Sequence, residues 1–300
     1  MRTLSVVISA FNEEKKIKDC LESVKFADEV IVIDNSSSDK TYEIASEYTK
    51  NIFKRDNNLM LNVNKNFGFS KAKGDFILSL DADERVTEEL RQEIKNILRH
   101  KMDFNAYNIP RKNIIFGKWI EHTGWYPDYQ LRLFKNGSGK FPEKHVHEMI
   151  EVSGETGTLN ENILHLNYET ITQFLDKLNR IYTPSESENL IRSGYKLNRS
   201  DFIRNPASEF VRRFFYQHGY KDGIHGLVLS LFMAFYHLIV LSRVWESQGF
   251  ESTNDSLYDF ELGSRDSAKE IRFWIYEEKR KREKNRIKKV FWNVKKKLPL

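Results

Sequence analysis

Two aspartates, Asp81 and Asp83, flank Ala82 directly after the strand-like run 76–80. Carboxylates this close repel one another unless a cation or basic side chains neutralise them. A hard divalent ion such as Mg²⁺ or Mn²⁺ binds such oxygens, completes its shell with substrate phosphates and withdraws charge from a leaving diphosphate. The alternative is an ordinary acidic turn that caps the next helix, because Asp-x-Asp alone is a common pattern.

A second acidic segment, Asp-Asn-Ser-Ser-Ser-Asp at 34–39, ends another strand-like run. The carboxylate of Asp34 can accept hydrogen bonds from a nucleobase or a ribose, and the serine-rich turn offers backbone N–H groups. Capping of the next helix by Ser38 or Asp39 is an equally good interpretation. Neither GxxxxGK[ST] nor GxGxxG occurs, so a P-loop or a Rossmann dinucleotide site is not supported.

An acid and an arginine, Asp128 and Arg132, stand four residues apart among the aromatic residues of 125–129. A carboxylate in an aromatic pocket can take a proton from an incoming hydroxyl, and an arginine can hold phosphate with two hydrogen bonds. The alternative is a surface ion pair between the two side chains.

Two histidines, His145 and His147, occupy alternate positions of a predicted strand and would therefore face the same side. A zinc site would need further ligands, and no cysteine is near. One histidine that assists a metal ion or a diphosphate is the functional interpretation, and a structural histidine is the commoner outcome.

The elements that must position these residues alternate along the first hundred residues. Since alternating strands and helices indicate a largely parallel α/β sheet, the carboxyl ends of its strands should share one edge. That edge would gather the acidic clusters at Asn12 and Glu13, at Asp34 and at Asp81. We predict strands at 4–11, 29–34, 51–54 and 76–80, and helices after Asn12 and at 40–49, 67–74 and 87–100.

From about residue 105 the pattern changes to short strand-like pieces rich in aromatic residues, and after 170 it is helical. The most apolar stretch is 224–245. Its uninterrupted apolar part, 227–241, is about fifteen residues long, short of the roughly twenty that span a bilayer. We therefore expect a core helix, or an interfacial or re-entrant one, followed by Arg243 and Trp245, which suit a membrane interface.

The net charge of +5 hides a strong asymmetry. Residues 279–300 carry eleven lysines and arginines against the single acid Glu283, so the rest of the chain is mildly acidic. Apolar residues recur at helical spacing among these lysines, which is typical of a basic amphipathic helix on an anionic membrane. A merely solvated tail and a nucleic-acid partner are the alternatives. The apolar residues are Ile287, Val290, Phe291, Val294 and Leu298.

Cys20 is the only cysteine, which excludes an internal disulfide and a cysteine-built zinc or iron–sulfur site and favours a reducing compartment. The residues after Met1 show no cleavable signal pattern, so we expect a cytoplasmic protein.

Three stretches, 4–14, 30–41 and 74–83, resemble family 2 glycosyltransferases of the GT-A fold in sequence and in order. The segment 124–134, the pair His147-Glu148 and the segment 234–246 resemble a bacterial subgroup, the β-glucosyltransferases of the lipopolysaccharide core. The family resemblance covers roughly residues 1–150, and the subgroup resemblance extends to about 250. It implies a GT-A type, mainly parallel sheet flanked by helices, with a helical C-terminal extension.

The resemblance also implies roles for individual residues. Asp34 would accept a hydrogen bond from the base, expected to be uracil, with Asp39 nearby, and Lys71 would contact the nucleotide. Asp81, Ala82 and Asp83 would form the donor-binding motif, with Asp83 on the metal, Mn²⁺ or Mg²⁺, and with Asp81 and His147 as further metal ligands. The residues expected to line the ribose and base are Ala10, Phe11, Asn12 and Glu13.

On the acceptor side, Asp128 matches the catalytic base of inverting members and Arg132 a basic residue that meets the diphosphate. Many members have Glu-Asp at the base position and Gln-x-x-Arg-Trp after it. This chain has Pro127-Asp128 and Gln-Leu-Arg-Leu at 130–133.

Together these features predict an inverting, metal-assisted glycosyltransferase that moves glucose or another hexose from a UDP-sugar to a lipid-linked or lipopolysaccharide-core glycan. We expect a GT-A domain at 1–215, with a nucleotide-binding half at 1–104 and an acceptor half at 105–215. Region 216–300 would associate peripherally with the inner membrane through its anionic surface. The alternatives are a protein acceptor, a degenerate GT-A scaffold, and a nucleotidyltransferase, whose glycine-rich phosphate loop is missing here.

Overall fold

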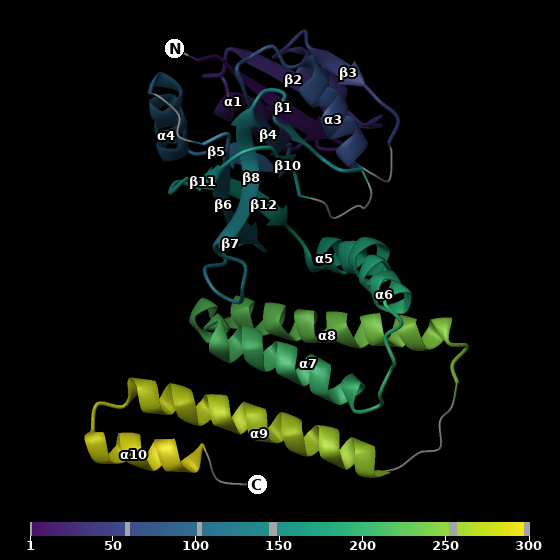
Figure 1. Cartoon of the computed structure of the whole chain (residues 1–300), viewed down its shortest axis with the longest axis vertical. Coiled ribbons are helices and arrows are strands. Elements are labelled where there is room, and N and C mark those ends of the chain that lie inside the picture. The colour runs from purple at the N-terminus through teal and green to yellow at the C-terminus, as the bar shows by residue number, and fades with distance from the viewer. Residues whose placement is uncertain (1, 58–60, 101–103, 144–148, 252–256, 297–300) are drawn as a thin grey trace. The chain divides into compact units, whose positions relative to one another are not determined.

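The computed structural model describes residues 2–57, 61–100, 104–143, 149–251 and 257–296, and the chain divides into two compact units (Figure 1). The first unit comprises Met1–Ile114 and Tyr126–Asn167, and the second comprises Ile115–Trp125 and Tyr168–Leu300. The chain therefore crosses from one unit to the other three times. The predicted division after 104 and 215 concerns function and stays a prediction.

The described residues form a ten-stranded mixed sheet, and all of its strands except β7 lie mainly in the first unit. The neighbouring strands β3, β2, β1 and β4 are parallel, whereas β8 is antiparallel to β4 and to β6. The predicted α/β class is thereby confirmed. Along the sheet the strands are β3 (Ile52–Lys54), β2 (Glu29–Asp34), β1 (Leu4–Ala10), β4 (Phe76–Asp81), β8 (Asp128–Lys135), β6 (Ala106–Ile115), β12 (Ile163–Tyr168) and β5 (Glu84–Val86), with β7 (Lys118–Trp119) and β11 (Thr156–Thr158) off this path.

Helices cover both faces of the parallel strands, which explains why all of β1 is buried. One face packs against α1 (Ile17–Ser23), α2 (Thr41–Ser46) and α4 (Glu88–Arg99), and the other against α3 (Leu61–Lys71). On α3, Gly68 allows the close approach, because a Cβ there would stand 2.5 Å from the Val7 side chain. A separate pair, β9 (Gly139–Lys140) and β10 (Glu151–Val152), is antiparallel.

The helix α4 shows how the sequence forms these elements. Its N-cap Thr87 accepts a hydrogen bond from the Leu90 N–H at 3.2 Å, and Leu90, Ile94 and Leu98 recur at helical spacing on its buried face. By contrast, α3 begins at Leu61 rather than near the predicted residue 67. Its first turns carry the buried polar side chains of Asn62 and Asn64, which conceal the apolar periodicity.

The second unit is helical after β12, as predicted. Its core includes Ile115, Ile120, Phe174 and Leu229. Helix α8 packs on α6 and α7, α7 packs on α9, and α10 packs on α9. The helices are α5 (Ile171–Lys177), the π-helix η1 (Leu178–Tyr182), α6 (Thr183–Arg192), α7 (Asp201–Val211), the π-helix η2 (Arg212–Tyr216), the 3₁₀ helix η3 (Gly219–Asp222), α8 (Ile224–Ser247), α9 (Leu257–Arg282) and α10 (Arg286–Lys295).

Helix α8 contains the apolar stretch 224–245. Among the described residues it alone is long and apolar enough to cross a membrane, with a mean hydropathy of 2.0 in its most apolar window, of which 33% is buried. Leu229, Val240 and Leu241 pack inside, whereas Leu231 and Phe235 are exposed. The helix therefore has a core-facing side and an outward apolar side.

Candidate active site

The carboxyl ends of the parallel strands bring the predicted acidic clusters together. Ala10, at the end of β1, pairs with Asp34 at the end of β2, and Ser9 pairs with Asp81 at the end of β4. Ala82 follows on the same edge, where its N–H donates to the Ser9 carbonyl at 3.2 Å. The edge of the sheet expected to carry the chemistry thus holds these groups on adjacent strands.

Asp34 is fully buried, and its two oxygens differ. The Ser37 N–H donates to Oδ2 at 3.3 Å, whereas Oδ1 has no hydrogen-bond partner. A buried acceptor without a partner is uncommon, and a ligand N–H is a natural donor to it. Because Oδ1 is itself buried, such a ligand reaches it only when a covering group moves.

The loops that follow β1 and β2 are joined by hydrogen bonds. The Asn12 N–H donates to Ser37 Oγ at 2.9 Å, and Asn12 Oδ1 accepts from the Ser38 N–H at 2.8 Å. Next to them, the Glu13 N–H donates to Thr41 Oγ1 at 2.7 Å. Phe11 precedes Asn12 in the loop after β1 and is 41% exposed, so its ring is available to a planar ligand.

The Asp39 carboxylate accepts hydrogen bonds from Thr41 and Glu14 at the start of α2. It accepts from Thr41 N–H at 3.0 Å, from Thr41 Oγ1–H at 2.5 Å and from the Glu14 N–H at 3.1 Å. Burial would raise the pKa of Asp39, but the hydrogen bonds from Thr41 and Glu14 outweigh it and hold the pKa below its ordinary value. The capping interpretation therefore accounts for this side chain, and a nucleotide contact stays a prediction.

Asp81 is neutralised by basic side chains. Lys65 Nζ lies 2.5 Å from Oδ1, and Arg132 Nη2 donates to Oδ2 at 2.8 Å. Burial would raise the pKa of Asp81, but these two cations hold it well below the usual range. Lys65 lies on α3, as does Lys71, whose expected contact with the nucleotide stays a prediction. Lys71 lies in the last turn of α3 over the Phe67 ring, almost two turns from Lys65, and the structure does not bring it to Asp81.

Asp83 lies beside His165, a histidine that no motif in the sequence indicates. Nε2 of His165, on β12, is 3.6 Å from Asp83 Oδ2, and its Nδ1 is 2.7 Å from Asn113 Oδ1. An amide oxygen only accepts, so Nδ1 carries a proton, and Nε2 is the ring nitrogen that faces Asp83. A carboxylate oxygen and an imidazole nitrogen fit a Mn²⁺ or Mg²⁺ ion whose remaining ligands are phosphate oxygens and water.

Across 2–57, 61–100, 104–143, 149–251 and 257–296, no group of three or more His, Cys, Asp or Glu side chains is arranged to hold a metal ion. A metal ion at Asp83 and His165 therefore stays a prediction. His145 and His147 lie outside the described residues.

Asp128, the first residue of β8, is held on both oxygens. Arg111 donates to Oδ2 through Nη2 at 2.6 Å and Nε at 2.9 Å, Asn113 Nδ2 donates to the same oxygen at 3.2 Å, and Gln130 Nε2 donates to Oδ1 at 2.9 Å. Burial would raise the pKa of Asp128, but the Arg111 charge and these hydrogen bonds hold it below its ordinary value. Oδ1, with one donor, keeps room to accept a proton from a ligand hydroxyl.

The ion pair between Asp128 and Arg132, one of the interpretations considered from the sequence, does not form. Arg132 Nη2 donates to Asp81 and to Glu84, the latter at 2.7 Å. Arg111 takes its place beside Asp128, because the two residues are direct partners across the antiparallel strands β6 and β8. Arg111 and Asn113 alternate on one strand face, a period-2 signal that the sequence does show.

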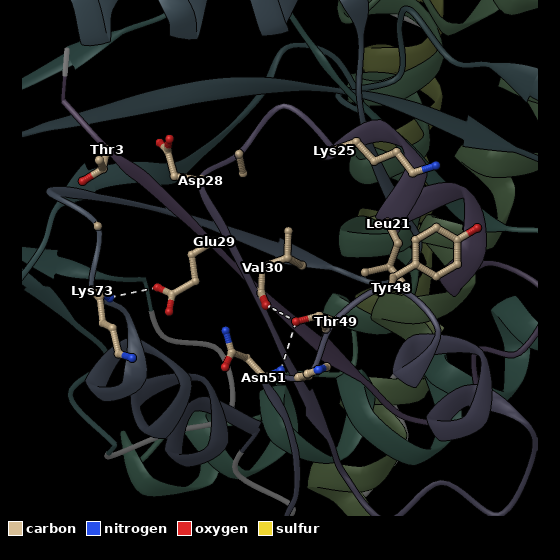
Figure 2. Close-up of a pocket in the computed structure, with 13 residues that line it drawn as sticks. Thr3, Leu21, Lys25, Asp28, Glu29, Val30, Tyr48, Thr49, Asn51 and Lys73 are labelled. Atoms are coloured by element: carbon tan, nitrogen blue, oxygen red, sulfur yellow. Dashed lines mark hydrogen bonds between the residues drawn. The ribbon is translucent and has the colours of Figure 1, made fainter.

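A cavity lies away from these groups, at the amino ends of the strands (Figure 2). Its volume is about 680 Å³, and no predicted site residue lines it. Several of its polar groups are engaged in fixing the fold. Glu29 accepts from Ser5 Oγ–H at 2.5 Å and from the Lys73 N–H at 2.9 Å, and Thr49 Oγ1–H donates to the Val30 carbonyl at 2.7 Å.

Comparison with known proteins gives a family match. Residues 5–151 match the model of glycosyl transferase family 2. An uncharacterized glycosyltransferase of Rickettsia felis is 28% identical over 260 residues, which cover 82% of this chain and 91% of that protein. The lipopolysaccharide core biosynthesis glycosyltransferase LpsC of Rhizobium meliloti is 22% identical and aligns over 83% of this chain and 94% of its own length.

Solved structures that are similar to this chain include a mannosyltransferase of Pyrobaculum calidifontis in complex with GDP-Man and Mn²⁺. It is 11% identical with a TM-score of 0.47, and the match covers 89% of this chain and 80% of that one. TarS of S. aureus, residues 1–349 in complex with UDP, is 14% identical with a TM-score of 0.42, over 85% of this chain and 94% of that one. The expected GT-A type fold is confirmed by the family match together with the observed sheet.

Proposed function

Residues 5–151 of this chain belong to glycosyl transferase family 2, and from that premise we propose an inverting, metal-assisted transfer of a hexose from a UDP-sugar. The observation that carries the proposal is Asp128, kept ionised by Arg111 on a strand adjacent to the one that ends in Asp81. An ionised carboxylate next to a donor-binding edge is what a general base for an acceptor hydroxyl requires.

In the proposed reaction, Asp128 takes the proton of the acceptor hydroxyl as its oxygen attacks the anomeric carbon. A C–O bond forms on one face of the sugar while the bond to the diphosphate breaks on the other, so the configuration inverts. The proton stays on Asp128, and the electron pair of the broken bond leaves with the nucleoside diphosphate. No protein nucleophile is needed.

On the donor side, Asp83 and His165 would hold a Mn²⁺ or Mg²⁺ ion, which when bound supplies Lewis-acid stabilisation of the leaving diphosphate. Lys65 and Arg132 surround Asp81 and add positive charge to the same edge. We assign Arg132 to the diphosphate through this charge, since its side chain is only 6% exposed and both of its ion-pair partners, Asp81 and Glu84, are carboxylates. Asp34 Oδ1 would receive the base N–H.

For the acceptor we propose a lipid-linked or lipopolysaccharide-core glycan at the inner face of the membrane. The name of the LpsC relative supports this class, and so does the surface of α10. On that helix Ile287, Val290, Phe291 and Val294 are 80, 63, 48 and 53% exposed, and lysines flank them. Such a face binds an anionic bilayer by burying apolar area while its cations meet the headgroups.

The contacts of α10 with α9 explain why this face points outward. Trp292 stacks on Tyr276 with ring centroids 5.6 Å apart, and Lys296 Nζ lies 2.6 Å from Glu277 Oε2. Since Trp292 is on the packed side, the residues at 287, 290, 291 and 294 occupy the opposite side of the helix.

The test of the enzymatic proposal is donor hydrolysis by the full chain with UDP-, GDP-, dTDP- and ADP-sugars and Mn²⁺, measured as released nucleotide. We expect slow, metal-dependent release from one UDP-hexose, lost in Asp83→Ala. Calorimetric titration with UDP and Mn²⁺ runs in parallel. No release together with no nucleotide binding would overturn the proposal in favour of a scaffold, whereas release from a GDP-sugar would correct the donor.

A further inference from the structure

Glu84 is a fully buried carboxylate one residue after Asp83, at the start of β5. Its Oε2 accepts from the Asp81 N–H at 2.9 Å. Its Oε1 accepts from Arg132 Nη2 at 2.7 Å and lies 3.4 Å from Arg111 Nη1. One oxygen of Glu84 is therefore shared by two guanidinium groups that come from different strands.

The other partners of these two arginines are the two carboxylates of the proposed chemistry. Arg132 continues to Asp81, and Arg111 continues to Asp128. A continuous chain of charged hydrogen bonds therefore runs from Asp81 through Arg132, Glu84 and Arg111 to Asp128. Its ends belong to the donor side and to the acceptor side of the site.

We propose that Glu84 is a positioning residue that fixes the general base against the donor site by holding Arg111 and Arg132 with one carboxylate oxygen. The inference rests on the proposed function and deepens it. Glu84 does not touch the reacting atoms, and it acts on Asp128 through Arg111.

An arginine side chain is mobile unless its partners hold it. A guanidinium on a long side chain has many rotamers, and a second carboxylate on its other edge restricts it to one orientation. With Glu84 in place, Arg111 has one edge on Asp128 and another nitrogen beside Oε1. Without the Glu84 charge, Asp128 is the carboxylate that still holds Arg111. The Arg111 guanidinium and the Asp128 carboxylate bound to it can then shift together.

A buried ion network also needs a reason, because well-packed apolar residues of the same volume are often at least as stabilising. Glu84 has 0% exposure, and Arg132 has 5%. Desolvation of these charged groups costs free energy. We infer that the network is kept because it orients the carboxylates of Asp81 and Asp128. Preorganised charges of this kind support catalysis because they need not reorganise during the reaction.

The test is a double-mutant cycle on the rate of UDP release from the saturating UDP-hexose, with the full chain. Glu84→Gln keeps the size of the side chain and removes its charge. We expect the rate constant to fall about 10- to 100-fold, the loss typical of outer-shell partners, while calorimetric titration shows that UDP–Mn²⁺ still binds. In an Asp128→Asn background the same substitution should have almost no further effect, since the base through which it acts is gone.

Two further variants complete the design. Arg111→Lys keeps the charge but loses the two-nitrogen grip on Asp128, and it should reproduce the loss even if Glu84→Gln fails to fold. Glu88→Gln is the matched control, because it removes an exposed carboxylate paired with Arg91 on α4 and should leave the rate unchanged.

The outcomes separate the two hypotheses. Wild-type rates in both Glu84→Gln and Arg111→Lys would overturn the positioning role, and so would losses that multiply with that of Asp128→Asn. A wild-type rate in Asp128→Asn itself would overturn the proposed base and, with it, any role that acts through the base.

Discussion

Near the carboxyl end of β4 and the amino end of β8 in the first unit, Lys65, Arg111 and Arg132 each have a carboxylate partner within 2.8 Å. Along α10 in the second unit the basic side chains are mostly exposed and lie beside an exposed apolar face. Charge that is paired and buried fixes positions, whereas charge that is displayed attracts a partner of opposite sign. The buried ion pairs suit a catalytic site, whereas the exposed basic side chains of α10 suit binding to an anionic surface.

The largest effect should come from the paired region. Asp128→Asn removes the proposed base while Arg111 and Gln130 keep partners of similar shape. We expect the rate of donor turnover to fall by about 10²- to 10⁴-fold, which is the usual contribution of a general base. UDP binding by calorimetry should stay within a factor of a few. Turnover close to wild type would remove Asp128 from the mechanism.

The next effect concerns the displayed region. Phe291→Glu places a carboxylate in the middle of the apolar face of α10 and should lower binding to vesicles containing anionic phosphatidylglycerol by about tenfold. The matched control is Asn293→Glu, which adds the same charge at an exposed position beside that face. Co-sedimentation with anionic and with zwitterionic vesicles measures both variants. Equal binding by the wild type and Phe291→Glu would exclude this face as the membrane contact.

A smaller effect should appear in the pH dependence of turnover. Because Arg111 holds the pKa of Asp128 below its ordinary value, the base stays ionised, and activity should decline only at a pH below the ordinary titration range of an aspartate. Arg111→Gln removes that charge, so the acid limb of kcat/KM should move to higher pH. The measurement is a kcat/KM profile on UDP-hexose release. A downward shift would contradict the electrostatic role given to Arg111.

The smallest effect compares two helix caps. Thr87 caps α4, whose buried face packs in the first unit, so Thr87→Ala should lower the free energy of unfolding by about 1 kcal/mol. Asn285 caps α10 by accepting from the N–H groups of Ile287 and Lys288. Because no residue of α10 is buried, Asn285→Ala should fray that helix and leave the main urea transition unchanged. A shift of the main transition by Asn285→Ala would show that α10 unfolds together with the core.

The parts of this structure that the sequence predicts follow from local rules. The runs that become β1, β2 and β4 are buried strands, and parallel strands place Ala10, Asp34 and Asp81 on one edge. The apolar positions of 287–294 also predict the exposed face of α10 by helical spacing alone. These conclusions need only short stretches of sequence.

The partners of the site residues depend on long-range register, which local rules do not contain. Arg111 meets Asp128 because β6 and β8 pair in one particular alignment. His165 reaches Asp83 from β12, more than eighty residues later. Lys65 was missed because the neighbouring Asn64 is polar although it is buried. The apolar spacing of a helix therefore does not show at the start of α3. In each case the missing information is which strand or helix turn becomes a neighbour.

Because the chain crosses between the two units three times, it cannot be cut at one point into two complete units. The segment 115–125 leaves β6, contributes the fully buried Ile115 and Ile120 to the core of the second unit, and returns just before Asp128. A fragment that ends at residue 167 would carry that segment without its core and expose its apolar residues to aggregation. The first unit is thus not a module that recombination can join to a different C-terminal region, and the two units should be exchanged between proteins only as a pair.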